Sequence, residues 1–460
     1  MKIELHDKRV LVLGLGDTGL SALRWLQRQG AHLSVADTRE TPPGVATLKA
    51  ELPRVKLHTG AFTEDAFKDT EIIVISPGVS MAEPMVQAAI SRGVKVIGDV
   101  ELFAQYKPAS AKVIAITGSN GKSTVTTLVG EMCKAAGMKT VVAGNIGLPV
   151  LDTLNGNVPD VYVLELSSFQ LETTSSLNAD AATMLNLSED HMDRYEGLAD
   201  YAQAKARVFF GEGVQVLNRQ DAFSMGMALQ GRAVVTFGLD KALNENEFGI
   251  DTELNITQLV RGSKALLATS EMKIAGLHNA ANALAALALC EAIGVPKAAM
   301  IKALREYKGL PHRVEWVADI GNIAFYDDSK GTNVGATYAA LKGLVGPSDL
   351  KKIVLIAGGD GKGQDFSPLA EIVAKNAQAV VLIGRDASLI ETALKGTKVD
   401  LIKADSLEAA VKAAYGLAKA GDAVLLSPAC ASFDMFRNYV HRAEVFVQTV
   451  KALAIQEAEA

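Results

Sequence analysis

The sequence predicts an α/β protein with three domains: a Rossmann-like N-terminal domain, a central P-loop ATPase domain and a Rossmann-like C-terminal domain. Short apolar runs alternate with helical patterns along most of the chain, which is typical of parallel sheets. Two of these runs lead into glycine-rich loops, at residues 14–19 and 118–123. The chain has 460 residues, enough for two to four domains. We place the boundaries at residues 1–98, 99–309 and 310–460.

Composition and charge narrow the class of protein. Hydrophobic residues make up 49% and charged residues 21% of the chain, which is ordinary for a globular protein. The formal net charge is −6 and no long basic run occurs, so we expect no nucleic-acid partner. Glu4, His6 and Asp7 stand where a secretory signal would be apolar. We therefore expect a cytoplasmic protein that does not bind membranes, and we expect a monomer.

The first domain begins with a dinucleotide-type fingerprint. An apolar run at 10–13 leads through Gly14, Gly16 and Gly19 into a helix, and the next run ends at Asp37, near the distance of a ribose contact. Taken alone, this pattern favours a nicotinamide cofactor. The geometry requires only a diphosphate at a helix N-terminus, however, so any nucleoside diphosphate would fit.

Neighbouring residues favour a diphosphate-bearing ligand over a dinucleotide. Thr38 and Arg39 add a hydroxyl and a cation directly after Asp37. A second turn, at 76–79, follows another apolar run at 72–75 and would face the same crevice.

The central domain opens on the most informative segment of the chain, a phosphate-binding loop. The apolar run at 113–116 leads through Gly118 and Gly121 into Lys122 and Ser123, where a helical pattern begins. Glycines let backbone N–H groups face an anion, and the helix N-terminus adds partial positive charge. The lysine can reach the β- and γ-phosphates of a nucleotide, and the serine hydroxyl can bind Mg²⁺. The loop is a shortened variant of the full pattern, which makes motor and switch NTPases poorer models.

Two further apolar runs of the central domain end near side chains suited to bind a metal ion. Glu165 ends the run at 161–164, where a Mg²⁺ ligand belongs beside a phosphate loop. His191 follows the run at 182–187 and lies among carboxylates, at the edge of the sheet where ligands bind. On the sequence alone, a surface glutamate and a structural histidine stay open as alternatives.

The rest of the chain follows the same alternation with one exception. A polar, less periodic stretch at 221–271 predicts an antiparallel insertion in the central domain. The third domain repeats the strand–helix pattern, with strands expected at residues 323–326, 353–357, 380–383 and 423–426.

Ordered motifs run through all three domains. They are TGSNGKST at 117–124, ELSSFQLE at 165–172, EDHMDRY at 189–195, GLHNAANA at 276–283, LPHRVE at 310–315, DDSKGTN at 327–333, GGDGKGQDF at 358–366 and SPACASFDMF at 427–436. The set resembles the Mur ligase family of cytoplasmic peptidoglycan-precursor synthetases. Within that family, the motif at 165–172 looks like that of the D-glutamate-adding member.

The resemblance implies an ATP-dependent amide-bond ligase. In such an enzyme the carboxylate of UDP-N-acetylmuramoyl-L-alanine attacks the γ-phosphate of ATP, which gives an acyl phosphate. The amine of D-glutamate then displaces phosphate and forms the amide. Two anions must meet, so Mg²⁺ and Lys122 have to offset their repulsion. The resemblance also implies two Mg²⁺ sites, the second held by a carbamylated Lys205, although Lys205 looks like an ordinary helix-face lysine on the sequence alone.

The resemblance also assigns roles to individual residues. The expected catalytic residues are Lys122, Glu165, His191 and Lys205, and the expected metal ligands are Ser123, Glu165, His191 and Lys205. The expected ATP-binding residues are Gly118, Ser119, Asn120, Gly121, Lys122, Ser123, Thr124, Asn279, Asn282, Arg313, Asp328 and Lys330. The expected substrate-binding residues are Asp17, Thr18, Thr38, Arg39 and Gly78 for the UDP end, Asn145 for the sugar–diphosphate side, Thr332, Lys362, Ser432, Phe433 and Tyr439 for D-glutamate, and Ser167.

Three alternatives compete with the interpretation of the chain as an ATP-dependent amide-bond ligase. A nicotinamide oxidoreductase would explain the first glycine motif but not the phosphate loop or Glu165. A folylpolyglutamate-type synthetase would share the core fold but not the uridine-binding motifs. A non-catalytic nucleotide-binding regulator would use the same loop without releasing phosphate.

Overall fold

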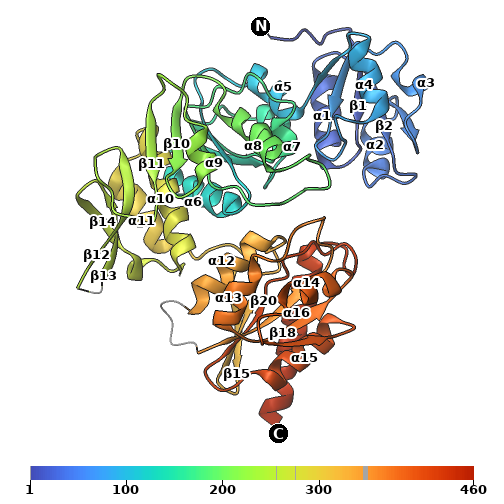
Figure 1. The fold of residues 1–460 in the computed structure, drawn as a ribbon. Helices are drawn as coiled ribbons and strands as arrows, with labels where there is room; N and C mark the ends of the chain where they lie inside the picture. The colour runs from blue at the N-terminus through green and yellow to red at the C-terminus, as the bar shows by residue number, and fades with distance from the viewer. Residues whose placement is uncertain (1, 255, 275, 346–350, 460) are drawn as a thin grey trace.

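The computed structural model describes residues 2–254, 256–274, 276–345 and 351–459, and it consists of three α/β domains (Figure 1). The predicted fold class is confirmed. The strands of the three sheets fall within residues 9–97, 112–268 and 315–426, each inside one of the expected ranges. The boundaries between the domains stay a prediction.

The N-terminal domain is built on a five-stranded parallel sheet with the strand order β3-β2-β1-β4-β5. The order reverses direction between β1 and β4, and ligands of open α/β sheets bind in the crevice at such a point. The elements are β1 (Arg9–Leu13), α1 (Asp17–Arg28), β2 (His32–Asp37), α2 (Val45–Glu51), β3 (Lys56–Thr59), α3 (Glu64–Phe67), β4 (Ile72–Ile75), α4 (Pro84–Ser91) and β5 (Lys95–Ile97).

Gly19 sets how closely α1 approaches the loop that follows β1. A Cβ atom at this position would lie 1.9 Å from the carbonyl oxygen of Gly14, far inside van der Waals contact. Gly16, in the same loop, has no atom within 4 Å of such a Cβ. The third glycine of the fingerprint is therefore required for packing.

The central domain contains a nine-stranded sheet in the order β14-β13-β12-β11-β10-β9-β6-β8-β7. Its elements are α5 (Asp99–Tyr106), β6 (Lys112–Thr117), α6 (Lys122–Ala135), β7 (Thr140–Gly144), η1 (Val150–Asn155), β8 (Val161–Glu165), α7 (Ser168–Leu171), β9 (Ala181–Met184), α8 (Leu198–Ala206), η2 (Arg207–Phe209), β10 (Val214–Asn218), α9 (Ala222–Gly226), β11 (Val234–Phe237), β12 (Glu247–Glu253), β13 (Ile256–Arg261), β14 (Lys264–Ala268), η3 (Thr269–Glu271), α10 (Leu277–Ala292) and α11 (Lys297–Glu306).

The antiparallel insertion expected at 221–271 is only partly correct. Strands β11 and β12 continue the parallel part of the central sheet, and the antiparallel pairs of this stretch are β12 with β13 and β13 with β14. All of these strands extend the same sheet, so the stretch is not an insertion. Strand β9 is also shorter than expected and ends at Met184, and the side-chain amide of Asn186 beyond it bonds the backbone of Asn120.

The C-terminal domain has a six-stranded sheet in the order β15-β16-β20-β17-β18-β19, parallel except for the edge strand β15. The four expected strands are confirmed. The elements are β15 (Glu315–Ile320), β16 (Ile323–Asp327), α12 (Val334–Val345), β17 (Ile353–Gly358), α13 (Leu369–Asn376), β18 (Ala377–Ile383), α14 (Ala387–Leu394), β19 (Asp400–Lys403), α15 (Leu407–Leu417), β20 (Ala423–Leu426) and α16 (Tyr439–Glu459). Within the part of the chain that the structure describes, no helix is both long and apolar enough to cross a bilayer.

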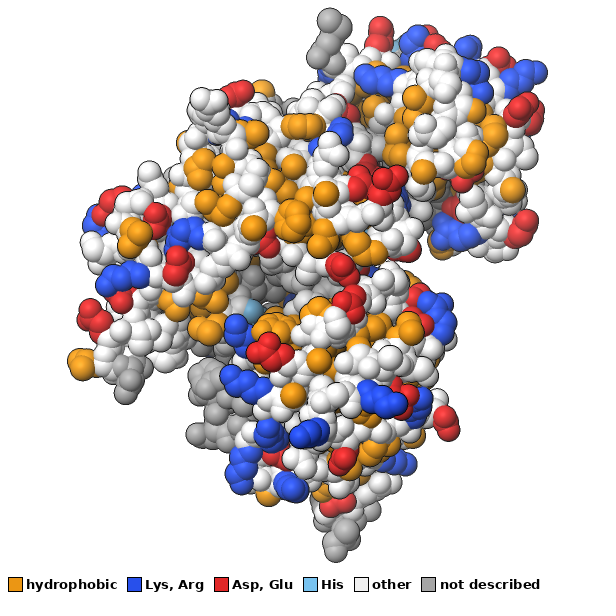
Figure 2. All heavy atoms as spheres, in the orientation of Figure 1, with side chains coloured by type: hydrophobic (Ala, Val, Ile, Leu, Met, Phe, Trp, Pro, Cys, Tyr) orange, Lys and Arg blue, Asp and Glu red, His pale blue; other side chains and the backbone are white. Residues whose placement is uncertain are grey.

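The two interdomain contacts differ in chemistry. One buried apolar cluster runs from the N-terminal sheet through α5 into the central sheet, where the rings of Phe103 and Tyr162 pack edge to face at 5.0 Å. The buried apolar clusters of the C-terminal domain contain only its own described residues. Its contacts with the central domain include hydrogen bonds and an ion pair, and a cavity of about 880 Å³ opens between the two domains (Figure 2).

We predict that Gly19→Ala destabilises the N-terminal domain by about 1–3 kcal/mol, because overpacking forces backbone shifts. The measurement is urea unfolding followed by the fluorescence of Trp25, which is buried on the same helix, in a Trp316→Phe background. The matched control is Gly16→Ala, which has room for its methyl group. Equal unfolding midpoints for the two variants would show that the close approach is not needed.

Candidate active site

The phosphate loop joins β6 to α6, and contacts with neighbouring residues fix its conformation. Gly121 has φ +83°, and a Cβ there would lie 2.5 Å from Oδ1 of Asn282. The backbone N–H of Asn120 donates to Oδ1 of Asn186 at 2.8 Å. The ammonium group of Lys122 folds over the loop and donates to the carbonyl oxygens of Gly118 at 2.8 Å and Ser119 at 2.9 Å. Burial lowers the pKa of Lys122, and the nearby Glu165 opposes that effect.

Glu165 ends β8 and lies beside the phosphate loop, because the sheet pairs it with Ile116 of β6. Its side chain is 2% exposed. One carboxylate oxygen, Oε1, accepts a hydrogen bond from Nδ2 of Asn145 at 2.8 Å. The other, Oε2, is buried and has no hydrogen-bond partner among the described residues. A buried carboxylate oxygen without a donor is costly unless a ligand completes it, and a divalent cation would do so.

His191 lies across the site in a strained backbone conformation with φ +59°. Burial lowers the pKa of its imidazole to about 4, with Asp190 opposing the shift, so the ring is neutral near pH 7. The neutral ring is the form that binds metal ions. The ring packs edge to face on Phe169 at 4.8 Å, which sets its orientation.

Lys205 is not the solvent-facing lysine that its helix pattern indicates. Its side chain is 1% exposed, donates to the carbonyl oxygen of Gly118 at 3.0 Å, and lies 4.4 Å from the ring centre of Tyr201. Burial holds its pKa well below the usual range, and Lys122 adds repulsion. The amine is thus disposed to be neutral beside the phosphate loop.

A crevice of about 690 Å³ lies between the N-terminal and central domains. It brings together all six residues expected at the UDP and sugar–diphosphate end: Asp17, Thr18, Thr38, Arg39, Gly78 and Asn145. Asp37, expected near a ribose under the dinucleotide interpretation, is already engaged. Its carboxylate accepts from the backbone N–H of Leu15 at 2.7 Å and from the guanidinium of Arg39 at 2.6 Å. It therefore orders the loop.

A second pocket, of about 330 Å³, lies on the other side of the phosphate loop. Among the expected ATP-binding residues it is lined by Asn120, Gly121, Thr124, Asn279, Asn282, Arg313 and Asp328. The guanidinium of Arg313 donates to Oγ of Ser123 at 3.1 Å, which links the start of the C-terminal domain to the loop. His278 lines the same pocket, and its buried Nδ1 has no hydrogen-bond partner among the described residues. Sequence reasoning missed His278, although it stands beside Asn279 in one of the motifs.

Asp328 and Lys330 both belong to the C-terminal domain, but only Asp328 lines this pocket. Oδ2 of Asp328 accepts from Oγ of Ser427 at 2.6 Å, and burial raises the pKa of Asp328 to about 7. The ammonium of Lys330 does not line the pocket and instead lies 3.9 Å from the ring centre of Tyr439.

The residues expected at D-glutamate are only partly gathered. The ammonium of Lys362 reaches the central domain and pairs there with the carboxylate of Asp190. Phe433 is 73% exposed, while Ser432 is buried in the same segment and Thr332 is half-buried. Ser167 is used structurally, since its Oγ accepts from the backbone N–H of Gln170 as the cap of α7.

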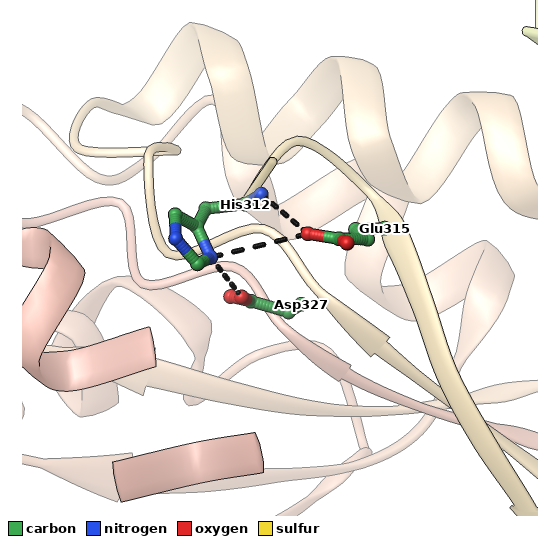
Figure 3. A group of neighbouring side chains, drawn as sticks. All are labelled: His312, Glu315 and Asp327. Carbon is green, nitrogen blue, oxygen red and sulfur yellow. Dashed lines mark hydrogen bonds and ion pairs between the residues drawn. The ribbon is translucent and has the colours of Figure 1, made fainter. Parts of the chain in front are cut away.

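A cluster near the start of the C-terminal domain, formed by His312, Glu315 and Asp327, was not found from the sequence (Figure 3). Nδ1 of His312 lies 2.7 Å from Oδ2 of Asp327, and its backbone N–H donates to Oε2 of Glu315 at 2.8 Å. Nδ1 of His312, the ring nitrogen nearest the two carboxylates, is already hydrogen-bonded to Asp327. We therefore interpret the cluster as a group that fixes the local backbone and not as a metal site. It holds the backbone of His312 at φ +63° and so directs the next residue, Arg313, toward the phosphate loop.

Comparisons with known proteins agree with this arrangement. Residues 8–98 match the model for the Mur ligase MurD-like N-terminal domain, 116–290 the Mur ligase middle domain, and 312–430 the Mur ligase glutamate ligase domain. A UDP-N-acetylmuramoylalanine–D-glutamate ligase from Methylobacillus flagellatus is 64% identical over 100% of both chains. The chain belongs to the Mur ligase family. Another ligase of the same name, from Thiobacillus denitrificans, is 56% identical over 99% of each chain.

Solved structures of other Mur ligases share the fold. MurF from Acinetobacter baumannii has a TM-score of 0.61 at 17% identity, covering 97% of this chain and 93% of its own. MurC from Thermotoga maritima, a UDP-N-acetylmuramate–alanine ligase, has a TM-score of 0.60 at 20% identity, covering 96% and 99%. At these identities the likeness shows the three-domain Mur ligase architecture alone.

We predict that Glu165→Gln weakens divalent-cation binding by at least about 10-fold, because it removes the anionic oxygen that has no other partner. Asn145→Ala removes only the bond to the second oxygen and should weaken binding by about 10-fold or more. Mn²⁺ titration followed by electron paramagnetic resonance, with ATP present, measures both effects. Glu131→Gln, an exposed carboxylate on α6, is the control, and equal Mn²⁺ affinity in all four proteins would refute the assignment.

Proposed function

We propose that the protein is an ATP-dependent ligase that joins D-glutamate to UDP-N-acetylmuramoyl-L-alanine in peptidoglycan-precursor synthesis. One observation carries the proposal: the crevice suited to a UDP-bearing substrate and the phosphate loop meet at a shared hydrogen bond between Asn145 and Glu165. A carboxylate at the end of a UDP-linked chain would there reach the γ-phosphate of ATP. The full-length relatives bear the name of this activity.

The reaction requires two anions to approach each other. The substrate carboxylate oxygen forms a bond to the γ-phosphorus, the bond to ADP breaks, and an acyl phosphate results. The amine of D-glutamate then attacks the acyl carbon, loses a proton, and releases phosphate from the tetrahedral intermediate. The ammonium of Lys122, which now donates to the loop carbonyls, is close enough to move to the γ-phosphate. The guanidinium of Arg313, which now donates to Ser123, could bind the same phosphate. These cationic groups stabilise charge that develops on the phosphoryl oxygens.

We propose that Ser123, Glu165, His191 and Lys205 hold two Mg²⁺ ions. The unpartnered oxygen of Glu165 and the neutral ring of His191 support this donor set. When bound, the ions polarise the phosphate oxygens and lower the repulsion between the reacting anions.

Lys205 can act as a ligand only after carbamylation. The neutral amine attacks carbon dioxide, so that a nitrogen–carbon bond forms, one carbon–oxygen π bond breaks, and a proton is released to water. The product is an anionic carbamate. The burial of Lys205 and the lowered pKa of its amine support this step, since only the unprotonated amine is nucleophilic.

For D-glutamate we propose a site on the C-terminal domain around Lys362, with Thr332, Ser432, Phe433 and Tyr439 nearby. The ammonium of Lys362 is suited to the side-chain carboxylate of the amino acid. We expect the enzyme to act as a monomer in the cytoplasm.

The proposal is tested by phosphate release from ATP in the presence of UDP-N-acetylmuramoyl-L-alanine. We expect release with D-glutamate and at least about 100-fold less with L-glutamate or L-lysine. Lys122→Ala should abolish release while the Kd for the UDP substrate stays within about 2-fold, because Lys122 lies outside the crevice. Lys134→Ala, at the exposed end of the same helix, is the control. Equal loss of UDP-substrate binding in Lys122→Ala would contradict the division of sites between domains.

We predict that Lys205→Ala lowers activity by about 100-fold and that short carboxylic acids restore part of it, since they replace the carbamate oxygens. The measurement is phosphate release across a series of formate and acetate concentrations. Lys122→Ala is the matched control and should not respond, because it lacks a cation and not an anion. A flat response in Lys205→Ala would count against the carbamate.

A further inference from the structure

The loop that carries His191 contacts both outer domains. We call residues 188–195, between β9 and α8, the His191 loop. Its anchoring residues toward the outer domains are Asp190 and Arg194, which sequence reasoning did not single out. Each lies within three residues of His191, and each crosses a different domain boundary.

Arg194 ties the loop to the N-terminal domain. Its guanidinium donates to the carbonyl oxygens of Pro77 at 2.9 Å and Val79 at 3.3 Å. These two residues flank Gly78 in the turn that lines the UDP crevice. The side chain is 15% exposed and is held from behind by Glu172, whose Oε2 accepts from it at 3.0 Å. A guanidinium with this many fixed acceptors holds the turn in one position.

Asp190 ties the same loop to the C-terminal domain. Its side chain is buried, and its carboxylate accepts from the ammonium of Lys362 and, at 3.3 Å, from Nδ2 of Asn333. Lys362 belongs to the glycine-rich turn after β17, and Asn333 precedes α12. Both donors therefore come from the domain that has no apolar core in common with the central domain.

The two anchors are mechanically connected within the loop. The backbone N–H of Arg194 donates to the carbonyl oxygen of His191 at 2.9 Å, which closes a turn between them. The ring of Phe169 lies between the two side chains, 3.9 Å from the guanidinium carbon of Arg194 and 4.8 Å from the ring of His191. A shift of the loop at either end therefore moves His191 as well.

We propose that Asp190 and Arg194 are positioning residues that couple the two outer domains through the His191 loop. Binding of the UDP substrate against the 76–79 turn holds Arg194, which holds the loop where Asp190 receives Lys362. Closure of the C-terminal domain over the amino acid is thereby favoured, and by linkage the closed domain favours the UDP substrate equally. The inference rests on the proposed function, because it assigns the two substrates to the two outer domains.

The test measures KM for both substrates in Arg194→Met and Asp190→Asn. Methionine keeps an apolar stem on Phe169 and removes the donors, and asparagine keeps the shape of Asp190 and removes its charge. We expect each variant to raise KM for both substrates by about 5-fold or more, including the substrate on the far side of the loop. Arg207→Met, whose guanidinium donates to Thr174 within the central domain, and Asp193→Asn, an exposed carboxylate of the same loop, are the controls and should leave both KM values within about 2-fold.

A purely local role gives a different result. If Arg194→Met changes KM for the UDP substrate alone and Asp190→Asn changes KM for D-glutamate alone, the coupling is refuted. Arg194→Lys, which keeps a cation for Glu172 but cannot bridge both carbonyls, repeats the test should the methionine variant unfold. Absence of D-glutamate-dependent phosphate release from the unmodified enzyme would overturn the proposed function instead, so the two failures are distinct.

Discussion

Burial of charge around the phosphate loop is the constraint on which the rest of the structure depends. Lys205 and the carboxylates of Glu165 and Asp190 are almost fully buried within this one junction, and Lys362 enters it from another domain. An uncompensated buried charge costs several kcal/mol, so each group must be paired, neutral or ligated. The structure uses all three solutions: Lys362 is paired, Lys205 is held toward its neutral form, and one oxygen of Glu165 is left for a ligand. The position of the C-terminal domain is thus tied to the charge balance of the site.

Much of this molecule could be predicted from its sequence, and the failures have physical reasons. The buried parallel strands stand out as apolar runs because both faces of each sheet are covered. The phosphate loop and Glu165 are found by residue type and by their place after a strand. Lys205 could not be found this way, since only the packing of α8 shows that it faces Gly118. The residue stretch 221–271 was misjudged because β11 and β12 are partly exposed and do not stand out as the continuous apolar runs of a buried parallel strand.

The functions of Asp190 and Arg194 depend on contacts between residues far apart in the sequence. In the sequence, Asp190 is one of several acidic residues beside His191. The neighbouring residues do not indicate that it pairs with Lys362, which lies 172 positions away. Arg194 likewise meets Pro77 from a distance of 117 positions. Such pairs are specified by the fold as a whole. The close approach of Gly335 to Ser188, where a Cβ would lie 2.8 Å from the serine hydroxyl, shows how closely the C-terminal domain approaches the His191 loop.

The different chemistry of the two domain contacts has a consequence for inhibitor discovery. The walls of the UDP crevice share an apolar core, so a compound that fills the crevice meets a site whose shape already exists and loses little affinity to reorganisation. A compound aimed at the region around Lys362 must bind where the two domains share no buried apolar cluster. Its apparent affinity is reduced by the fraction of molecules that are closed. If the proposed coupling holds, screening against the unliganded protein would under-report ligands of the proposed amino-acid site, and including a saturating UDP-linked ligand would recover them.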